Sequence, residues 1–297
     1  MLKKITIATR KSPLALWQAE YVASLLKSKN HGIEISFKKI VTDGDKIIDK
    51  PLYEVGGKGL FLKQLEEALL SKEADIAVHS MKDIPAQLHS ELTISAILRR
   101  EDARDVFVSN KMSSINEIQP GNKIGSSSIR RICLLNDFCQ NIKISELRGN
   151  IHTRLEKLEQ KNMDGIILAA AGLKRLKLES KIKEYLDYTK WIPAIGQGAI
   201  GIEMKKDSSI KSYIENLNHK ETSICINTER MISKFFNASC ETPLGAYAHL
   251  ENKNIKIFGM AANPQTKILK KESIEGELKN SKELSIRLAE KLATICL

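Results

Sequence analysis

Residues 4–26, KITIATRKSPLALWQAEYVASLL, contain the structural unit that is repeated over the first two-thirds of this chain. Isoleucines alternate with polar residues over 4–8, which predicts a β-strand, and the polar turn TRKSP follows. Ser12 is suited to cap the N-terminus of a helix, and Pro13 is suited to its first position. Apolar residues then recur at helical spacing, so the stretch predicts a strand, a turn and an amphipathic helix.

The same alternation of strand and helix recurs further along the chain. Strand-like runs occur at IEISFKKIV (33–41), ADIAVHS (74–80), NKIG (122–125), IKISEL (142–147) and GIILAA (165–170). Alternating strands and helices favour a largely parallel sheet with helices on both faces. Two such units of roughly 100 residues each predict two α/β domains.

From about residue 216 the pattern changes. A helix is predicted over 220–236, followed by the loop NASCETPLG (237–245) and the strand-like runs AYAHL, NIKIFGM and KILKKESIEG. The last predicted helix has Asn280 as its N-cap and Glu283 at the matching position of a capping box. These features predict a small α+β third domain with an antiparallel sheet.

The composition limits the class of protein. The chain has 297 residues, a net charge of +11 and 42% hydrophobic residues, which is ordinary for a globular protein. It contains no run of about 18 apolar residues, so we expect no membrane span. Its N-terminus, MLKKITIATR, lacks the apolar core of a signal peptide, and we therefore expect a cytoplasmic location.

Cysteine usage and glycine motifs exclude several kinds of site. The five cysteines include no C-x-x-C spacing, which predicts reduced thiols and no metal site. VGGKGLF (55–61) lacks the Walker A pattern, and no aromatic residues are interleaved with the basic ones, so neither a nucleotide nor a nucleic acid is expected. The net charge fits an anionic partner, although lysines scattered over a solvated surface would give the same value.

Cations and hydroxyl groups follow the ends of the predicted strands in both α/β units. Ligands of open α/β sheets bind at the carboxyl ends of strands, where helix N-termini add N–H donors. A single arginine after a strand is usually a solvated surface residue, but here five strand ends carry such groups. Because arginine holds a carboxylate through two parallel hydrogen bonds, we expect a ligand with several carboxylates or phosphates. The residues are Arg10, Ser12, Lys82, Asp83, Ser126, Ser127, Ser128, Arg130, Arg131, Arg148, Gly149, Asn150, Arg154, Lys174 and Arg175.

Three side chains, one of them in this set, are candidates for a role beyond ligand binding. Asp83 would stay ionised among cations, and it could balance positive charge on a substrate or pass a proton to a leaving group. The plainer alternative for Asp83 is a surface ion pair. For His79 we predict a packed side chain bonded to the backbone. Cys240 lies in a loop, where a cysteine is either an attachment point or nucleophile, or an unreactive thiol.

Eight segments of the chain resemble the porphobilinogen deaminase family, in the same order along the sequence. They are IATRKSPLALWQA, VGGKGLF, ADIAVHSMKDIP, REDARD, GSSSIRR, LRGNIHTRL, ILAAAGLKRL and IPAIGQGAIGIE. The third domain matches less closely than the first two. The resemblance implies a transferase of tetrapyrrole (haem) biosynthesis that condenses four porphobilinogen molecules into linear hydroxymethylbilane and releases ammonia.

The resemblance also implies residue roles. The primer of the family is a dipyrromethane cofactor joined by a thioether to a loop cysteine, here Cys240, and the catalytic aspartate is here Asp83. The substrate porphobilinogen carries two carboxylates, which fits a cleft of arginines. Nothing in the sequence suggests an obligate dimer, so we expect a monomer. The implied cofactor- and substrate-binding residues are Arg10, Ser12, Lys58, Lys82, Ser127, Ser128, Arg130, Arg131, Arg148, Gly149, Arg154, Arg175 and Gln197.

The implied fold is α/β and has three domains. Two resemble type II periplasmic binding proteins, with mostly parallel sheets of the five-stranded type and a cleft between them, and the third is a smaller α+β domain with an antiparallel sheet. The expected boundaries are 1–98 plus 194–215 for domain 1, 99–193 for domain 2 and 216–297 for domain 3. TDGDKIIDKPLYEVGG (42–57) resembles the family's mobile loop over the cleft.

Three residues depart from the family pattern. Ala238 and Ser239 stand where two glycines commonly precede the cysteine, which is expected to stiffen the loop. Ser126 stands where threonine is usual, so the hydroxyl group is kept.

Two other functions stay open at this point. One is a non-enzymatic anion-binding protein with the same two-domain cleft, although the third domain and its cysteine speak against it. The other is a nucleic-acid-binding protein, which is suggested by charge alone and would show steep salt dependence of DNA affinity.

Overall fold

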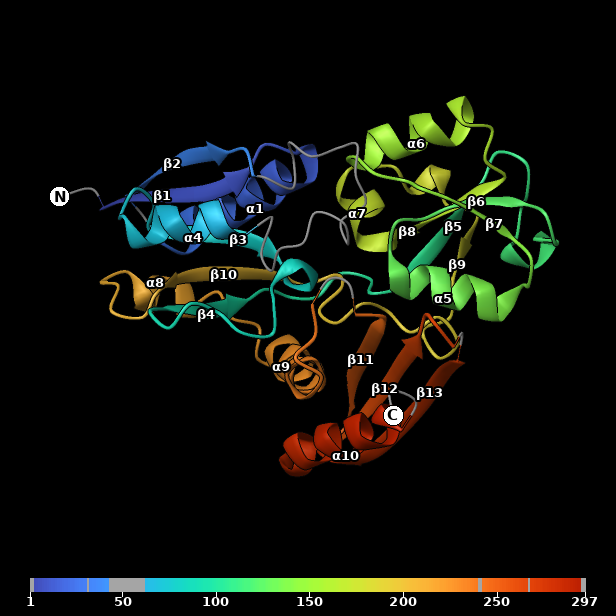
Figure 1. The fold of residues 1–297 in the computed structure, drawn as a ribbon. Coiled ribbons are helices and arrows are strands. Elements are labelled where there is room, and N and C mark those ends of the chain that lie inside the picture. Colours follow the sequence, from blue (N-terminus) through green and yellow to red (C-terminus); the bar gives the residue numbers. More distant parts are fainter. Residues whose placement is uncertain (1–2, 31, 43–61, 240–241, 267, 295–297) are drawn as a thin grey trace.

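The computed structural model describes residues 3–30, 32–42, 62–239, 242–266 and 268–294, which form three β-sheets with helices packed on them (Figure 1). Sheets A and B lie beside each other, and sheet C lies below both in the view of Figure 1. The segment VGGKGLF and all but the first residue of the expected loop over the cleft lie outside the described residues. The three-sheet architecture provides the frame on which the site is built.

Sheet A contains five strands, with three helices packed on it. They are β1 (Lys3–Arg10), β2 (Ile33–Ile40), β3 (Ile76–Ser80), β4 (Leu92–Ile97), β10 (Ile200–Lys205), α1 (Pro13–Lys29), α4 (Lys63–Leu70) and α8 (Lys211–Glu215). In the order β2-β1-β3-β10-β4, only β10 runs against the other strands. α1 and α8 cover the face that carries Ile5 and Ile7, whereas α4 covers the face that carries Ala8. The expected mostly parallel sheet with helices on both faces is confirmed.

Sheet B repeats this arrangement. It contains β5 (Asp105–Val108), β6 (Lys123–Gly125), β7 (Lys143–Ser145), β8 (Gly165–Ala169), β9 (Glu184–Tyr185), α5 (Ile129–Phe138), α6 (Ile151–Gln160) and α7 (Ala170–Arg175). In the order β7-β6-β8-β5-β9, only β5 is reversed. α5 packs on the face of Phe107 and Ile167, and α6 and α7 pack on the face of Val106 and Val108.

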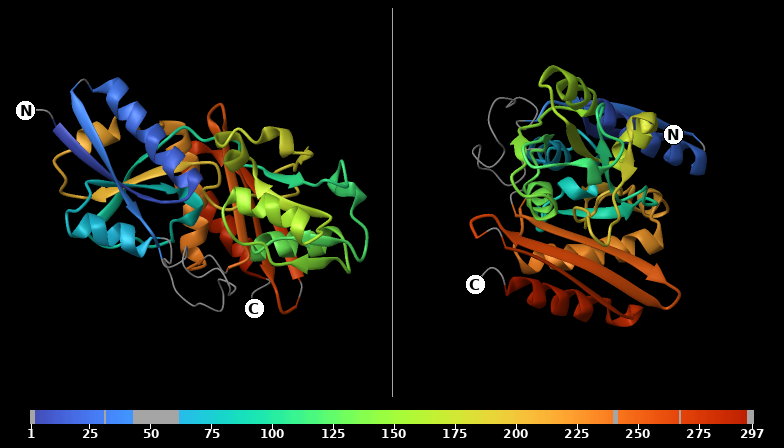
Figure 2. Two further views of the ribbon diagram at one scale, coloured as in Figure 1. Left: turned by 90° about the horizontal axis from the view of Figure 1, so that it is seen from above. Right: turned by 90° about the vertical axis from the view of Figure 1, so that its right-hand side faces the viewer.

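Sheet C is antiparallel, as predicted. It contains β11 (Leu244–Glu251), β12 (Asn254–Asn263) and β13 (Ile268–Glu277), with α9 (Lys220–Phe235) and α10 (Ser281–Ala293) packed against it. The right-hand view of Figure 2 shows α10 on the outer side of this sheet. Met260 and Ala262 of β12 join the core of sheet B, so sheet C is anchored to its neighbour by apolar contact.

Helix caps follow the sequence at one end of the chain and not at the other. The Ser12 hydroxyl accepts a hydrogen bond from the Ala15 N–H at 3.3 Å, and Pro13 begins α1, as predicted. The predicted capping box of Asn280 and Glu283 is wrong, because Asn280 makes no side-chain cap bond. A 3₁₀ turn precedes α10 and leaves Asn280 at φ −95° and ψ 9°, outside the extended conformation that an N-cap needs. Such turns lie at Met81–Asp83, Ile115–Glu117, Glu179–Lys181 and Leu278–Asn280.

Two chain segments cross between sheets A and B and hydrogen-bond to each other. The Leu98 N–H donates to the Ile200 carbonyl at 2.9 Å, and the Glu101 N–H donates to the Gly198 carbonyl at 3.1 Å. Gly198 has φ +88°, and a Cβ atom there would lie 2.4 Å from the Glu101 carbonyl oxygen. The paired crossovers therefore depend on a residue without a side chain.

We expect Gly198→Ala to destabilise the protein by about 2–4 kcal/mol, from a positive φ and a clash with backbone. Gly121→Ala is the matched control, because Gly121 has φ +90° but a Cβ atom there would meet no atom within 4 Å. Gly121→Ala should therefore cost only the positive-φ part, about 1–2 kcal/mol. Urea unfolding gives the midpoint of unfolding for both variants. Equal midpoints would show that a Cβ atom at residue 198 fits beside the Glu101 carbonyl at no extra cost.

Candidate functional site

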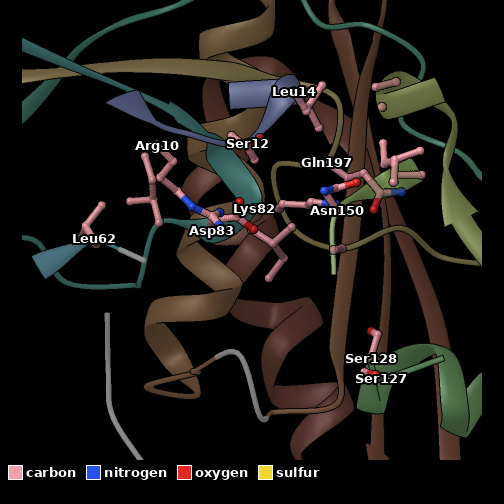
Figure 3. A pocket seen from close by; sticks show the side chains of 18 of the residues that line it. Arg10, Ser12, Leu14, Leu62, Lys82, Asp83, Ser127, Ser128, Asn150 and Gln197 are labelled. Atoms are coloured by element: carbon pink, nitrogen blue, oxygen red, sulfur yellow. The ribbon is translucent and has the colours of Figure 1, made fainter. Parts of the chain in front are cut away.

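A cleft of about 1210 Å³ lies between sheets A and B. Figure 3 shows its side chains projecting inward from the segments that follow β1 and β3, from the start of α5 and from the crossover at Gln197. Lys174, which also follows a strand, does not line it but pairs with Glu101 at 2.8 Å. The cleft is lined by every described residue for which the family resemblance implies a binding role: Arg10, Ser12, Lys82, Ser127, Ser128, Arg130, Arg131, Arg148, Gly149, Arg154, Arg175 and Gln197, together with Asp83.

Two predicted site residues, Lys58 and Cys240, lie outside the described residues. The residues that flank the cysteine segment, Ser239 and Thr242, both line the cleft. They also bond to each other, since the Ser239 N–H donates to Thr242 Oγ1 at 3.0 Å and the Thr242 N–H donates to the Ser239 carbonyl at 3.1 Å. The two residues on either side of this segment are therefore hydrogen-bonded to each other beside the cleft.

Asp83 ends the 3₁₀ turn that follows β3, and elements distant in sequence hold this turn. The Met81 N–H donates to the Ala199 carbonyl at 3.0 Å. From α9, the Arg230 guanidinium donates to the carbonyls of Ile84 at 3.2 Å and Pro85 at 2.9 Å. Asp83 also lines a side pocket of about 60 Å³ together with residues of the β1 end. The carboxylate is therefore carried on a backbone fixed from two directions.

The cations in the cleft are crowded enough to shift one another's pKa. Desolvation by the cleft walls lowers the pKa of Lys82 to about 8, with repulsion from Arg131 and Arg154 adding to it and Asp83 opposing it. Lys82 is nevertheless an exposed side chain, so its ammonium group is in contact with the water of the cleft. Desolvation also lowers the pKa of Arg154 to about 10, with repulsion from Arg131, Arg148 and Arg10. An anionic ligand would relieve this repulsion.

Arg130 and Arg131 are bound by a carboxylate that the sequence did not single out, Asp105. Arg130 Nη2 donates to Asp105 Oδ2 at 2.8 Å, and Arg131 donates to Oδ1 through Nη2 at 2.7 Å and Nε at 3.2 Å. Gln197 Nε2 donates to the same Oδ1 at 2.9 Å. Burial alone would raise the pKa of Asp105, but the two guanidinium groups hold it well below its usual value. In the sequence, Asp105 is marked only by its position at the end of the REDARD segment, where β5 begins.

The start of α6 presents backbone and side-chain groups to the cleft. Gly149 has φ +108°, where a Cβ atom would lie 2.8 Å from the Thr153 side chain. The Asn150 side chain caps α6 by accepting from the Thr153 N–H at 3.1 Å. Arg154 Nε donates to the Gly149 carbonyl at 2.8 Å, which orients this guanidinium.

His79 is packed, as predicted, but its described partner is a carboxylate and not the backbone. Its Nε2 lies 3.0 Å from Glu203 Oε2, and both side chains are buried. The insertion of β10 beside β3, which local periodicity did not indicate, pairs Gly201 with His79 and places Glu203 two positions along on the same strand. The histidine therefore binds a carboxylate and not the backbone.

Two negative findings apply to the described part of the chain. It contains no group of three or more His, Cys, Asp or Glu side chains placed to hold a metal ion. None of its helices combines the length and the apolar character needed to cross a membrane.

The lowered pKa of Lys82 predicts a pH dependence of anion binding. The ammonium is charged below pH 8 and loses its charge as the pH rises through about 8. We therefore expect the affinity for a ligand with several carboxylates to fall through this range in the wild type and to fall less in Lys82→Arg, whose guanidinium stays charged. Titration of the ligand itself affects both proteins equally, so the ratio of the two pH profiles is the measurement. A ratio that stays constant from about pH 6.5 to 9 would contradict the assignment.

Several solved structures resemble the chain in fold at low sequence identity. The methionine-binding protein MetQ is 13% identical, with 84% of this chain and 99% of that chain covered and a TM-score of 0.45. A TRAP periplasmic solute binding protein from Desulfovibrio salexigens is 10% identical, with 80% of each chain covered and a TM-score of 0.44. The periplasmic aliphatic sulphonate binding protein from Escherichia coli is 15% identical, with 77% and 68% covered and a TM-score of 0.41. Similarity at this level says nothing about the ligand.

Family models match most of the sequence. Residues 5–212 match the model described as porphobilinogen deaminase, dipyromethane cofactor binding domain. Residues 223–294 match the porphobilinogen deaminase C-terminal domain. The first match contains all the described cleft residues that were predicted to bind carboxylates. The chain belongs to the porphobilinogen deaminase family.

Proposed function

We propose that this chain is a transferase that condenses four porphobilinogen molecules into hydroxymethylbilane, with release of ammonia at each step. Membership of the porphobilinogen deaminase family supports this reaction. The observation that carries the proposal is the convergence of cationic side chains from both sheets on one cleft that also contains Asp83. The expected cytoplasmic location and monomeric state stay predictions.

The cleft fits a dipyrromethane, whose two rings carry several carboxylates. Its walls supply guanidinium and hydroxyl groups, and the buried Nε of Arg130 has no hydrogen-bond partner among the described atoms. We propose that Cys240 holds the dipyrromethane through a thioether and that Arg130, Arg131 and Arg154 bind its carboxylates. When bound, this cofactor supplies the pyrrole carbon on which the growing chain is extended.

The residues of the cleft have two further roles, which are substrate binding and proton transfer. Arginines at the ends of strands bind the acetate and propionate of the incoming porphobilinogen and orient its ring. Asp83, in its acid form, gives its proton to the amine as the C–N bond breaks, so that ammonia departs as a neutral molecule. A new C–C bond then forms at the aminomethyl carbon, and the ring proton that it displaces returns to the carboxylate of Asp83. The same carboxylate, once ionised, balances positive charge on the pyrrole nitrogen. The turn held by Arg230 and Ala199 keeps this acid in place.

The covalent cofactor predicts a mass difference. The intact wild-type protein, produced where porphobilinogen is available, should exceed its sequence mass by one dipyrromethane, and Cys240→Ser should remove that excess. Cys139→Ser is the matched control, because Cys139 is a partly exposed free thiol that does not line the cleft. Mass spectrometry of the three proteins decides the point. An unmodified and inactive wild type would contradict the proposed function.

The acid role of Asp83 predicts a loss of turnover with little loss of binding. Asp83→Asn should lower kcat by at least about 100-fold, while the affinity for porphobilinogen changes only a few-fold. Asp187→Asn, an exposed site outside the cleft, should leave both quantities unchanged. Steady-state kinetics and calorimetric titration measure them. If the chain were only an anion-binding protein, the wild type would show no turnover for the substitution to remove.

A further inference from the structure

The clamp around Asp105 differs from the other ionic contacts of the cleft because it is fully buried. Asp105 and its carboxylate are 0% exposed, and the side chains of Arg130 and Arg131 are 4% and 7% exposed. Both arginines nevertheless line the cleft, whereas Asp105 does not. The carboxylate therefore lies behind the two guanidinium groups, on the side away from the ligand space.

Each of the two guanidinium groups is fixed at a second point. Arg130 Nη1 donates to the Ile192 carbonyl at 2.7 Å, and Arg131 Nη1 donates to the Ile167 carbonyl at 2.9 Å. With Asp105 holding the other end, neither plane can turn without breaking a buried hydrogen bond. The Nε–H of Arg130 still finds no partner among the described atoms.

Arg154 provides the contrast. It makes no ion pair within the described residues, and its Nε bonds only to the Gly149 carbonyl. Arg154 is held by this one hydrogen bond, whereas Arg130 and Arg131 are each held by Asp105 and by a backbone carbonyl. The cleft therefore contains two kinds of arginine with different freedom.

We infer that Asp105 is a positioning residue, which fixes the guanidinium groups of Arg130 and Arg131 in the orientation that binds a carboxylate of the dipyrromethane or of porphobilinogen. This inference rests on the proposed function and adds to it a residue that touches neither ligand. The benefit is pre-organisation, since the arginines lose little freedom when a carboxylate arrives. Gln197, which also donates to Asp105 Oδ1, holds the carboxylate in turn.

A simpler role for Asp105 makes the opposite prediction. If the carboxylate only offset the charge of two adjacent arginines, its neutralisation would leave the cleft more positive and tighten the binding of anions. If Asp105 positions the arginines, neutralisation lets them repel each other and weakens binding. The sign of the change in affinity therefore separates the two roles.

The experiment compares Asp105→Asn, Asp105→Glu and the control Asp102→Asn in the full-length protein. Asp102 is the matched residue, because it pairs with Arg104 in the same REDARD segment at 2.7 Å but lines no part of the cleft. Kinetics with porphobilinogen give KM and kcat, and intact mass gives the fraction of protein that carries the dipyrromethane. Thermal unfolding identifies which variants are folded.

We expect KM for porphobilinogen to rise at least about tenfold in Asp105→Asn, the size of one lost charge-assisted contact, or the fraction carrying dipyrromethane to fall to the point where no turnover remains. Asp105→Glu, which keeps the charge but moves it, should raise KM as well. Asp102→Asn should stay within about twofold of the wild type. A folded Asp105→Asn with full cofactor and an unchanged or lower KM would overturn the inference. An inactive wild type would instead contradict the proposed function.

A measurement on the wild-type protein covers the case in which neither Asp105 variant folds. In arginine-labelled wild type, the Nε–H of Arg131 should give a slowly exchanging NMR signal, because it donates to the buried Asp105 Oδ1. Arg131→Lys assigns this signal by its loss. The signal should persist and shift when porphobilinogen is added. A signal that exchanges as fast as that of exposed arginines, or that does not respond to porphobilinogen, would contradict the inference.

Discussion

Several cations share one cleft, and the surrounding structure has to offset the repulsion between them. This repulsion adds to desolvation, the larger cause, in lowering the pKa of Lys82 to about 8 and that of Arg154 to about 10. A cleft of this charge is costly in the folded state without anions, since each charge is partly removed from water and lies near others of the same sign. The frame must hold these groups together, and a ligand with several carboxylates lowers the free energy by binding among them.

Buried carboxylates outside the ligand space hold this frame together. Asp105 binds two arginines of the cleft, and Glu229 of α9 plays a comparable part at the crossovers. Glu229 Oε1 accepts from the Ala248 N–H at 2.9 Å, and Oε2 accepts from the Gly196 N–H at 2.8 Å, while the side chain also pairs with Arg100. One side chain thus joins sheet C to both segments that connect sheets A and B. Loss of one partner of such a buried pair leaves an uncompensated charge, at a cost of about 3–5 kcal/mol.

α9, which packs against sheet C, contributes to the site. α9 supports the turn of Asp83 through Arg230 and through Ile226, which packs with Ile84 and Met81. The same helix leads into the loop segment that contains the predicted attachment cysteine. The acid and the loop therefore share one supporting element, so a displacement of α9 would move both with respect to the arginines of sheet B.

Most of the cationic cleft residues could be read from the sequence, although Lys174 does not line the cleft and only the family resemblance indicated Gln197. Local periodicity was sufficient for the α/β class, the repeated strand and helix units and the antiparallel third sheet, because these patterns depend on residues that are close together in the chain. It did not indicate β4, β5, β9 and β10, and so it missed the Glu203 partner of His79 and the crossovers. It also missed Asp105 as the partner of Arg130 and Arg131, since that contact joins residues 25 and 26 positions apart in the chain. These pairings follow from the three-dimensional arrangement alone, because the partner of a buried charge depends on which distant strands lie side by side, and no local pattern encodes that.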